Sequence, residues 1–363
     1  MTDRVPVRVV IVGCGVIGRQ HAALVASLSG ATVVALVDEV DTVAAGVGDL
    51  LHQSGSPRPQ VFAGLAQALA AVPCDLVAVC TPSGVHAAAA TLALDAGKHV
   101  VIEKPLDADL ARARGMLAAA DRARERGLVV SVISQHRFDP ASVAVSRAIE
   151  SGRFGRLTSG IGSVAWWRSQ DYYEWGAWRG TWALDGGGAV MNQGVHTVDL
   201  LVWFLGRPVE IHAHTALLAH ERVEVEDTAV ATIRFESGAL GVVHATTAAY
   251  PGLTVRVQVH GTKGSAVIDN DRLSYFHAAD AGASSSDMGL MGSGNQAAAE
   301  LAGFDAELDA PADATVDWAG HVRQYDDILD AIATGREPGV RVADAVIALA
   351  TVRAIYVSAT LGL

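Results

Sequence analysis

The sequence predicts an α/β N-terminal Rossmann domain with a doubly wound parallel sheet, followed by a C-terminal α+β domain with a large, mostly antiparallel open sheet. Three features support this prediction. Apolar, β-branched runs alternate with helical segments through the first third of the chain, which is typical of a parallel sheet. A glycine-rich turn follows the first of these runs. Shorter strands joined by glycine turns occupy much of the second half. We therefore expect two domains, at 1–137 and 138–363.

The composition fits two globular domains and a small-molecule partner. The chain has 363 residues, of which 50% are hydrophobic and 18% are charged. A single core seldom grows beyond roughly 250–300 residues, so this length allows two domains. The formal net charge of −12 argues against a general affinity for nucleic acid or an anionic membrane.

We expect a cytoplasmic protein. No apolar run approaches the roughly 18–20 residues of a membrane span, and the N-terminus leads into a strand without a signal-peptide core. The cysteines are Cys14, Cys74 and Cys80, which lie in or near predicted buried strands. Their spacing is not that of metal ligands, which favours reduced thiols.

A dinucleotide site is predicted after the first strand, 7–12. The strand leads into Gly13-Cys14-Gly15-Val16-Ile17-Gly18 and then into a helix that ends near residue 28. The glycines allow a tight turn and a close approach of the backbone to a pyrophosphate at the positive end of the helix. A second strand, 32–37, leads to Asp38, which would accept hydrogen bonds from the adenosine ribose. Glu39 follows with no arginine nearby, which favours NAD over NADP. The predicted cofactor contacts of this region are Gly13, Gly15, Val16, Ile17, Gly18 and Asp38.

Four more strands complete the predicted parallel sheet, at 61–62, 75–80, 99–102 and 128–134. The turn Thr81-Pro82 follows one of them, at a carboxyl end, where open α/β sheets bind their ligands. His86 opens the next helix. A contact with the cofactor and a plain helix-start role explain this histidine equally well.

The strand at 99–102 ends in Glu103-Lys104-Pro105. A lysine at a strand tip beside the cofactor would orient a hydroxyl or neutralise a developing alkoxide. The alternative is a solvated loop lysine. Pro105 restricts Lys104 to an extended backbone, and the bond between the two residues can be cis.

An aromatic loop is predicted after a strand at 156–168. Aromatic rings on a loop are harder to explain as core than rings at helical or strand period. Rings fit the C–H faces of sugars, and arginine binds hydroxyls or a carboxylate. The alternative is a satellite hydrophobic cluster or a subunit contact. The loop contains Tyr172, Tyr173, Trp175, Trp178, Arg179 and Trp182, and Arg168 stands at its start.

The central candidate segment begins at the three glycines 186–188. Apolar residues at 190, 195, 198, 201 and 202 predict a helix that is entered from this flexible turn. Asn192 and His196 lie one turn apart and share a face of it. We expect His196 to accept the substrate's proton, because imidazole titrates near neutral pH. The alternative is a structural histidine.

The remaining chain predicts four strands, at 209–216, 228–235, 240–247 and 253–260, with hairpin turns at 236–238 and 261–264. Helices are predicted at about 318–334 and 342–361, where His321 and Gln324 either line the pocket or lie on the helix surface. The segment 278–315, rich in Ala, Gly, Ser and Asp, is either a mobile lid or a disordered insertion. We predict no metal site, because no carboxylate or cysteine completes a set with His212, His214 and His220.

Together these motifs resemble the Gfo/Idh/MocA family of NAD(P)-dependent oxidoreductases. The resemblance rests on the glycine turn at 13–18, Thr81-Pro82, Glu103-Lys104-Pro105, the glycine turn with Asn192 and His196, and the C-terminal helix pair. It implies a Rossmann domain and an α+β domain whose open sheet often forms subunit contacts, hence a homodimer or homotetramer through the C-terminal sheet. It also implies oxidation or reduction of a carbon of a sugar, cyclitol or related polyol.

The resemblance also implies roles for single residues. Lys104 matches the family's lysine, and His196 matches its histidine general acid/base. The aspartate that is frequent one turn before the histidine corresponds to Asn192, whose amide can orient a hydroxyl but cannot carry a proton. This departure puts in doubt any substrate taken from the inositol dehydrogenases. Trp178-Arg179 resembles a pair that lies near the nicotinamide in some members. The further predicted cofactor contacts are Thr81, Pro82, His86, Glu103, Lys104, Gln135, Trp178 and Arg179, and the predicted substrate contacts are Lys104, Arg168, Trp178, Asn192 and His196.

The expected function is an NAD-dependent oxidoreductase. It would transfer a hydride between nicotinamide and a secondary alcohol or ketone of a sugar, sugar acid or cyclitol. Lys104 would orient the reacting hydroxyl, with Asn192 beside it, and His196 would act as general acid and base. One alternative is a redox-neutral, glycoside-cleaving enzyme in which retained NAD transiently oxidises the sugar. Another is a sugar-sensing protein that keeps the cofactor without turnover.

Overall fold

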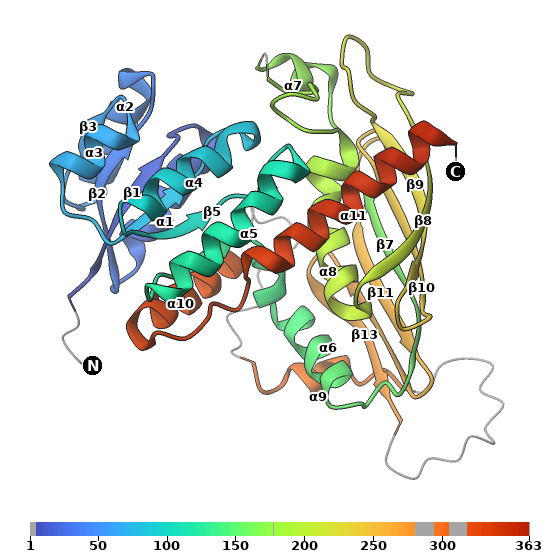
Figure 1. Ribbon diagram of the computed structural model, residues 1–363. Coiled ribbons are helices and arrows are strands. Elements are labelled where there is room, and N and C mark those ends of the chain that lie inside the picture. The colour runs from blue at the N-terminus through green and yellow to red at the C-terminus, as the bar shows by residue number, and fades with distance from the viewer. Residues whose placement is uncertain (1–4, 177, 280–293, 305–317, 363) are drawn as a thin grey trace. The chain divides into compact units, whose positions relative to one another are not determined.

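The computed structural model describes residues 5–176, 178–279, 294–304 and 318–362 (Figure 1). Contacts within the chain divide it into two units. The first unit contains 1–134, 181–186 and 321–346, and the second contains 135–180, 187–320 and 347–363. The chain therefore returns to the first unit twice after leaving it at Ser134. The single boundary predicted at 137 does not describe these returns.

The first unit contains the predicted parallel sheet. Its six strands lie in the order β3-β2-β1-β4-β5-β6, and every pairing is parallel. The strands are β1 (Val7–Val12), β2 (Ala31–Val37), β3 (Gln60–Phe62), β4 (Leu76–Val79), β5 (His99–Ile102) and β6 (Val130–Val132). The helices are α1 (Val16–Ser27), α2 (Asp41–Gln53), α3 (Leu65–Ala71), the 3-10 turn η1 (Ser83–Val85), α4 (His86–Asp95), α5 (Leu110–Glu125) and α10 (Ala319–Thr334). Helix α2 is not among the predicted elements, because Gly46 and Gly48 interrupt its apolar periodicity.

The strand order brings the predicted cofactor turns to one edge of the sheet. Neighbours of β1 are β2 on one side and β4 on the other, so the winding of the sheet reverses between β1 and β4. Open α/β sheets bind their ligands outside the strand carboxyl ends at such a point. The glycine turn follows β1, Thr81-Pro82 follows β4, and Glu103-Lys104 follows the next strand, β5.

Helix α10 packs with the first unit although it comes late in the sequence. The side-chain amide of Gln324 accepts a hydrogen bond from the Ser134 N–H at 3.0 Å and donates one to the Val132 carbonyl at 2.8 Å. Ser131 forms an antiparallel bridge with Arg341 just beyond the helix. These contacts satisfy backbone groups along β6, the edge strand of the sheet.

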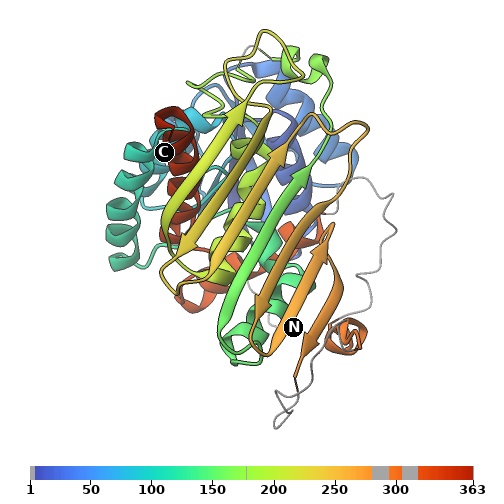
Figure 2. The same ribbon diagram turned by 90° about the vertical axis from the view of Figure 1, so that its right-hand side faces the viewer.

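The second unit is built on a seven-stranded sheet. Its order is β13-β12-β11-β7-β10-β9-β8, and only the β7–β10 pairing is parallel, so the predicted, mostly antiparallel sheet is confirmed. Figure 2 looks onto the face of this sheet that α8 does not cover. The strands are β7 (Leu157–Ala165), β8 (Pro208–Ala216), β9 (Thr228–Phe235), β10 (Leu240–Thr246), β11 (Val255–Gly261), β12 (Gly264–Asp269) and β13 (Arg272–Ala278). The helical elements are η2 (Gln135–Phe138), α6 (Pro140–Glu150), α7 (Gln170–Glu174), η3 (Val190–Gly194), α8 (Val195–Leu205), α9 (Ala297–Leu301) and α11 (Val342–Leu361), of which residues 347 onward belong to this unit.

Helix α8 lies close against the middle of the sheet because β7 presents glycines to it. A Cβ atom at Gly160 would stand 2.8 Å from methyl groups of Leu201 and Leu205. A Cβ atom at Gly162 would stand 2.8 Å from the Thr197 methyl group. Contacts this short do not occur between real atoms, so a larger residue at 160 or 162 would require these side chains, or α8 itself, to shift.

A buried ion pair joins η2 to α8. The Arg137 guanidinium donates two hydrogen bonds to the Asp199 carboxylate, at 2.8 and 2.6 Å. Both residues are buried, with exposed fractions of 7% and 4%. The guanidinium also lies over the Trp203 ring. This pair fixes the residue that follows His136 against the helix that carries His196.

A buried carboxylate holds the glycine turn that precedes α8. The Gly188 N–H donates to Oε2 of Glu226 at 3.0 Å, and the Val190 N–H and the Tyr356 hydroxyl donate to Oε1 at 2.9 and 3.0 Å. A Cβ atom at Gly188 would stand 1.7 Å from the Glu226 carbonyl oxygen, so the close approach requires glycine. Burial raises the pKa of Glu226 to about 7, although these hydrogen bonds act in the opposite direction.

Helix α11 corrects one expectation from the sequence. By length and composition alone it is apolar enough to cross a membrane, whereas no run of this kind was expected. Asp344 and Arg353 lie within it, and half of its most apolar window is buried inside the protein. Core helices pass the same test, so the finding is weak evidence for a span.

The predicted lid or insertion at 278–315 falls mostly on residues 280–293 and 305–317, which lie outside the described residues. Its described part contains α9. There the Gln296 N–H donates to the Phe276 carbonyl, and the Ala278 N–H donates to Oε1 of Gln296. This part of the segment therefore packs beside β13.

We predict that Arg137→Met destabilises the protein by about 3–5 kcal/mol, because the buried Asp199 carboxylate loses two N–H donors. The matched control is Arg256→Met, which removes an exposed arginine paired with Asp269 and should cost less than about 1 kcal/mol. Urea unfolding followed by circular dichroism measures both variants. Equal losses in the two would contradict the prediction.

Glu226 should make stability depend on pH. In the folded protein its pKa is about 7, against 4.5 for an ordinary glutamate. Between these values the folded protein keeps a proton that the unfolded chain has released, so the free energy of unfolding falls as pH rises from about 4.5 to about 7 and then levels off. The contribution is about 3 kcal/mol.

The test compares the wild type with Glu226→Gln, which carries no titrating group at this position. We expect the free energy of unfolding of this variant to lack the part of the decline between about pH 5 and 8 that Glu226 causes. This window is set by the shifted pKa, and urea unfolding measures the decline. Glu224→Gln, at an exposed position two residues away, is the control and should follow the wild type. If Glu226→Gln also ran parallel to the wild type, the carboxylate would not titrate as described.

Candidate functional site

The glycine turn after β1 fits a pyrophosphate. Gly13 has φ +85°, and a Cβ atom there would stand 2.7 Å from the Cys80 carbonyl oxygen. A Cβ atom at Gly18 would stand 1.7 Å from the Gly13 carbonyl oxygen, whereas Gly15 faces open space. Helix α1 begins at Val16 without a capping side chain and without an acidic residue in its first turn, so its first N–H groups suit an anion. Val16 and Ile17 are 53% and 42% exposed, and their contact with the cofactor stays a prediction.

Asp38 is oriented at the end of β2 by the glycine turn itself. Its Oδ2 accepts the Cys14 N–H at 2.8 Å, and its Oδ1 accepts the Val40 N–H at 2.9 Å. Each carboxylate oxygen can accept a second hydrogen bond, so Asp38 can still bind the ribose hydroxyls of a dinucleotide. Glu39 beside it is exposed. This donor and acceptor set fits NAD, and two carboxylates would repel the phosphate of NADP.

A buried network supports the turn that carries Lys104. Oε1 of Glu103 lies 2.7 Å from Nε2 of His21, and Oε2 accepts the Lys104 N–H at 3.0 Å. The hydroxyl of Tyr325 lies 2.7 Å from the other ring nitrogen of His21. Burial acts to raise the pKa of Glu103, but the hydrogen bond to His21 and nearby positive groups lower it to about 2. Glu103, a predicted cofactor contact, is thus placed under the turn, where it fixes the backbone of Lys104.

His86 connects two of the cofactor turns. It is 1% exposed, and its ring nitrogens lie 2.7 Å from the Thr81 carbonyl oxygen and 2.8 Å from the Pro105 carbonyl oxygen. Burial lowers the pKa of His86. The Lys104–Pro105 bond, which the sequence allows to be cis, is cis. The structure therefore gives His86 a role in holding the turns together, and its contact with the cofactor stays a prediction.

The turn after β4 also offers a polar group to a ligand. The hydroxyl of Thr81 is buried and has no hydrogen-bond partner among the described residues. Buried polar groups are nearly always satisfied. Thr81 and Pro82 follow β4, beside the glycine turn, as the predicted cofactor contact requires.

The second unit carries the predicted acid/base residues on an irregular helix. The sequence predicts one regular helix from the glycine turn, but residues Val190–Gly194 form a π-turn, η3, and the α-helix begins only at Val195. Single π-turns occur often at functional sites. Asn192 lies in this turn, and its Nδ2 donates to the Gly187 carbonyl at 3.3 Å. His196 lies in the first turn of α8.

A second histidine lies against His196. The rings of His136 and His196 are perpendicular, with centroids 5.1 Å apart. Nδ1 of His136 lies 2.8 Å from Oδ2 of Asp139 and 3.0 Å from Oδ1 of Asp271. Burial acts to lower the pKa of His136, but the two carboxylates raise it to about 10. His136 therefore carries a positive charge at neutral pH.

Gln135, a predicted cofactor contact, lies against the same histidine. Its Nε2 is 3.1 Å from Nε2 of His136, and its Oε1 is buried without a partner among the described residues. Exchanging the oxygen and nitrogen of the amide would put an acceptor opposite the charged imidazole. Sequence reasoning missed His136 and Asp271, because residues 136 and 271 come together only through the fold.

The aromatic loop packs around Tyr172. The guanidinium of Arg179 lies 4.3 Å from the Tyr172 ring centroid and 4.5 Å from that of Trp178, and the guanidinium of Arg168 lies 5.1 Å from Tyr172. The Tyr172 hydroxyl accepts a hydrogen bond from Gln193 of η3 at 3.3 Å. The loop includes the short helix α7, which the sequence did not predict. Within the second unit, the predicted substrate residue Arg168 thus lies over the Tyr172 ring beside the π-turn, and Trp178 contacts Arg179 over the same ring.

Groups of side chains that could hold a metal ion lie away from His212, His214 and His220, the histidines considered in the sequence. His220 contacts Asp227 and the Arg168 carbonyl oxygen, whereas His212 is exposed beside Glu210. Two other groups bring three ligand atoms within 4.8 Å of one another: His21, Glu103 and His321, and His136, Asp139 and Asp271. Each of these groups also contains a close histidine–carboxylate contact.

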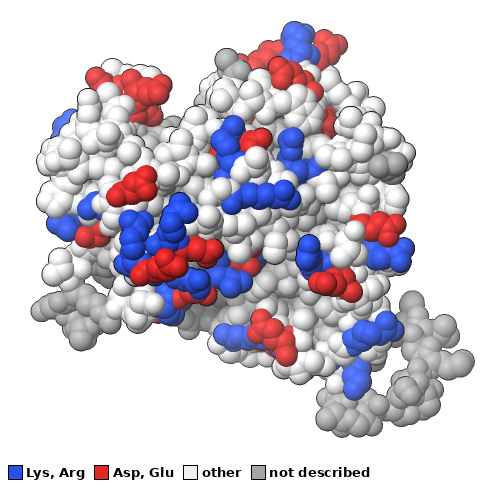
Figure 3. Space-filling model, viewed as in Figure 1, with Lys and Arg blue, Asp and Glu red and all other residues white. Residues whose placement is uncertain are grey.

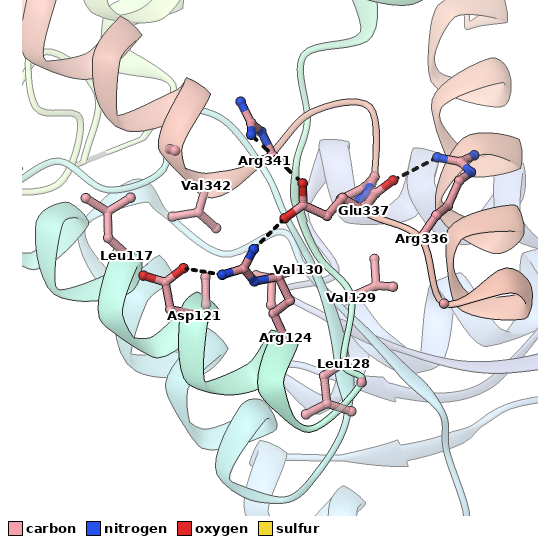
Figure 4. A pocket seen from close by; sticks show the side chains of 15 residues that line it. Leu117, Asp121, Arg124, Leu128, Val129, Val130, Arg336, Glu337, Arg341 and Val342 are labelled. Atoms are coloured by element: carbon pink, nitrogen blue, oxygen red, sulfur yellow. Dashed lines mark hydrogen bonds and ion pairs between the residues drawn. The ribbon is translucent and has the colours of Figure 1, made fainter.

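A cavity of about 190 Å³ lies at the opposite end of the parallel sheet from the cofactor turns (Figure 4). It is lined by the end of α5, by the start of β6 and by residues 335–343. Figure 4 shows Arg124 between Asp121 and Glu337, and Arg341 contacts Glu337 and Asp344. In Figure 3, acidic and basic side chains are likewise intermixed over α5 and α10. These arginines already have carboxylate partners, so the cavity is not a strong anion site.

Comparison with known proteins agrees with this geometry. Residues 7–133 match the family model described as an oxidoreductase family with an NAD-binding Rossmann fold, and residues 143–267 match the GFO/IDH/MocA C-terminal domain. The chain is 30% identical to scyllo-inositol 2-dehydrogenase (NAD(+)) of Bacillus subtilis, across 72% of this chain and 73% of that one. It is 28% identical to levoglucosan dehydrogenase of Pseudarthrobacter phenanthrenivorans, across 54% of this chain and 56% of that one.

A solved structure supports the same grouping. The WlbA dehydrogenase from Bordetella pertussis, in complex with NADH and UDP-GlcNAcA, superimposes with a TM-score of 0.82 at 30% sequence identity. The match covers 100% of this chain and 98% of that one. The glycine turn at 13–18, which forms a cradle for a pyrophosphate, the two sheets and these matches together show that the chain belongs to the Gfo/Idh/MocA family of oxidoreductases. It contains the family's NAD-binding Rossmann domain.

Proposed function

We propose that this protein is an NAD-dependent dehydrogenase that transfers a hydride between nicotinamide and a secondary alcohol or ketone of a sugar, sugar acid or cyclitol. The observation that carries the proposal is the cradle at Gly13–Gly18, which excludes side chains at Gly13 and Gly18, is open at Gly15 and adjoins Asp38. Two relatives support the substrate class by their names, as dehydrogenases of scyllo-inositol and of levoglucosan.

In this mechanism, Lys104 holds the reacting oxygen. It follows β5 at the sheet edge that also presents the glycine cradle, and the buried Glu103 carboxylate fixes its backbone. Its ammonium would donate to the substrate hydroxyl and stabilise negative charge on that oxygen as the C–H bond breaks. NAD, when bound, supplies the hydride acceptor.

His196 would take the hydroxyl proton during oxidation and return it during reduction. A histidine must be neutral to accept a proton. His136 lies beside His196, with ring centroids 5.1 Å apart. Asn192 would orient the substrate, because its amide offers hydrogen bonds but no proton.

We also propose a homodimer or homotetramer formed through the sheet of the second unit. The sheet face opposite α8 carries apolar side chains that are about half exposed, including Val230, Leu240 and Val242. Exposed apolar surface of this kind on an open sheet is typical of subunit contacts.

The proposal predicts reduction of NAD+ in preference to NADP+, because Asp38 and Glu39 together would repel the phosphate of NADP. Purified protein is mixed with each cofactor and a panel of monosaccharides, sugar acids, nucleotide sugars, cyclitols and glycosides, and nicotinamide absorbance is followed. Activity with one of these classes and NAD+ would support the dehydrogenase. If free cofactor were never reduced, but bound NAD were released on denaturation and glycosides were consumed, the redox-neutral alternative would replace it.

His196→Ala and Lys104→Ala should each lower kcat at least about a hundredfold, since each removes a group that handles the proton or the charge on oxygen. The controls are His212→Ala, at an exposed position on β8, and Lys98→Ala, at the opposite end of β5, where Nζ donates to the Cys74 carbonyl. Both controls should keep the wild-type kcat in steady-state kinetics. Full activity in both site variants would rule out these roles.

A further inference from the structure

Two arginines of the second unit, Arg168 and Arg179, are held differently from those that pair with a carboxylate. Arg137, Arg153 and Arg256 each form an ion pair with a carboxylate. Arg168 and Arg179 lie over aromatic rings instead, and among the described residues no carboxylate forms an ion pair with either.

The aromatic contacts leave the hydrogen-bonding edges of these guanidiniums available. Arg179 lies over Tyr172, Trp178 and Trp175, and Arg168 lies over Trp166 and Tyr172. A guanidinium on an aromatic face uses its flat side for that contact, and its N–H groups point outward in the plane. In addition, Nε of Arg168 is buried and has no hydrogen-bond partner in the described part of the chain.

The two positive charges share one ring. Their centres lie 4.3 and 5.1 Å from the centroid of Tyr172, so they repel each other in a half-buried setting where water screens charges less. Glu174 of the short helix α7 is engaged by Arg222 and Gln170. An anion bound by the two guanidiniums would offset their positive charge and supply an acceptor to Nε of Arg168, which has none among the described residues.

The cluster is fixed in place and lies beside the candidate catalytic helix. The Arg168 N–H donates to the Thr247 carbonyl at 2.9 Å, and the Arg168 carbonyl oxygen lies 2.8 Å from Nε2 of the buried His220. The Tyr172 hydroxyl contacts Gln193, the residue after Asn192. A group bound by the arginines would therefore lie near the π-turn of the second unit.

We propose that Arg168 and Arg179 form the subsite for an anionic group of the substrate, so that the preferred substrates are sugars carrying a carboxylate or a phosphate. Guanidinium forks match the paired oxygens of both anions. The rings of Trp175 and Trp178 would contact the C–H face of the sugar. This inference rests on the proposed dehydrogenase function for the rest of the site.

Binding can be measured without turnover. Protein saturated with NADH cannot oxidise an alcohol, so titration calorimetry of that complex reports affinity alone. The probes are three matched series: glucose, glucuronate and glucose 6-phosphate; galactose, galacturonate and galactose 6-phosphate; and mannose, mannuronate and mannose 6-phosphate. In at least one series an acidic member should bind about tenfold or more tightly than its neutral partner, as hydrogen bonds to charged groups require. Whether the uronate or the phosphate gains more identifies the anion.

The variants decide whether the arginines cause the preference. Arg168→Gln and Arg179→Gln should each reduce the preference for the acidic sugar about tenfold and leave the neutral sugar nearly unchanged. Arg222→Gln, which removes an exposed arginine of the neighbouring loop, should keep the preference. If the arginines had a purely structural role, the substitutions would weaken the binding of acidic and neutral sugars alike.

Two results would overturn the subsite. One is equal affinity for acidic and neutral members in all three series, and the other is a preference that survives both substitutions. The dehydrogenase proposal fails separately. An acid preference that depends on the arginines, together with no hydride transfer to any sugar, would keep the subsite and reject the dehydrogenase. Hydride transfer between nicotinamide and neutral sugars, with no preference for acidic sugars, would reject the subsite and keep the dehydrogenase.

Discussion

Two adjacent acidic residues at the start of β9 hold both parts of the candidate site in the second unit. Glu226 accepts hydrogen bonds from the turn at Gly188, where a helix start leaves N–H groups that no helical carbonyl can satisfy. Asp227 accepts backbone N–H groups of 218–220 and contacts the ring of His220, whose other nitrogen reaches the carbonyl of Arg168. The turn before α8, the candidate catalytic helix, and the start of the aromatic loop are therefore fixed from one point on the sheet.

The cofactor region could be predicted because its determinants are local. A strand, a glycine turn, a helix and an acidic residue at the next strand end follow one another within 7–38, and each is recognisable from neighbouring residues. The hairpin at 236–238 was predictable for the same reason, since Gly238, at φ +84°, has the turn conformation that glycine allows. Both sheets, and the position of Lys104 at a strand tip, followed from such local patterns.

The rest depended on contacts that no local pattern contains. His136 is charged because a turn 135 residues later, at Asp271, lies beside it (271 − 136 = 135). Gln324 was predicted to line the pocket or to lie on the helix surface, and Tyr325 only to belong to a late helix, yet they complete the edge of β6 and the network around Glu103. The π-turn was missed because the apolar spacing around Asn192 is compatible with an ordinary helix. The burial of Glu226 could not be predicted from the sequence either, since glutamate is seldom buried.

The late return of the chain to the first unit limits how this protein can exchange parts with its relatives. Residues 321–346 belong with 1–134, so the N-terminal third is not a complete Rossmann module. A hybrid gene that joined residues 1–134 to another member's remaining sequence would pair β6 and His21 with a foreign helix in place of α10. Recombination between members is therefore expected to preserve function only when the first 134 residues and α10 are inherited from the same parent.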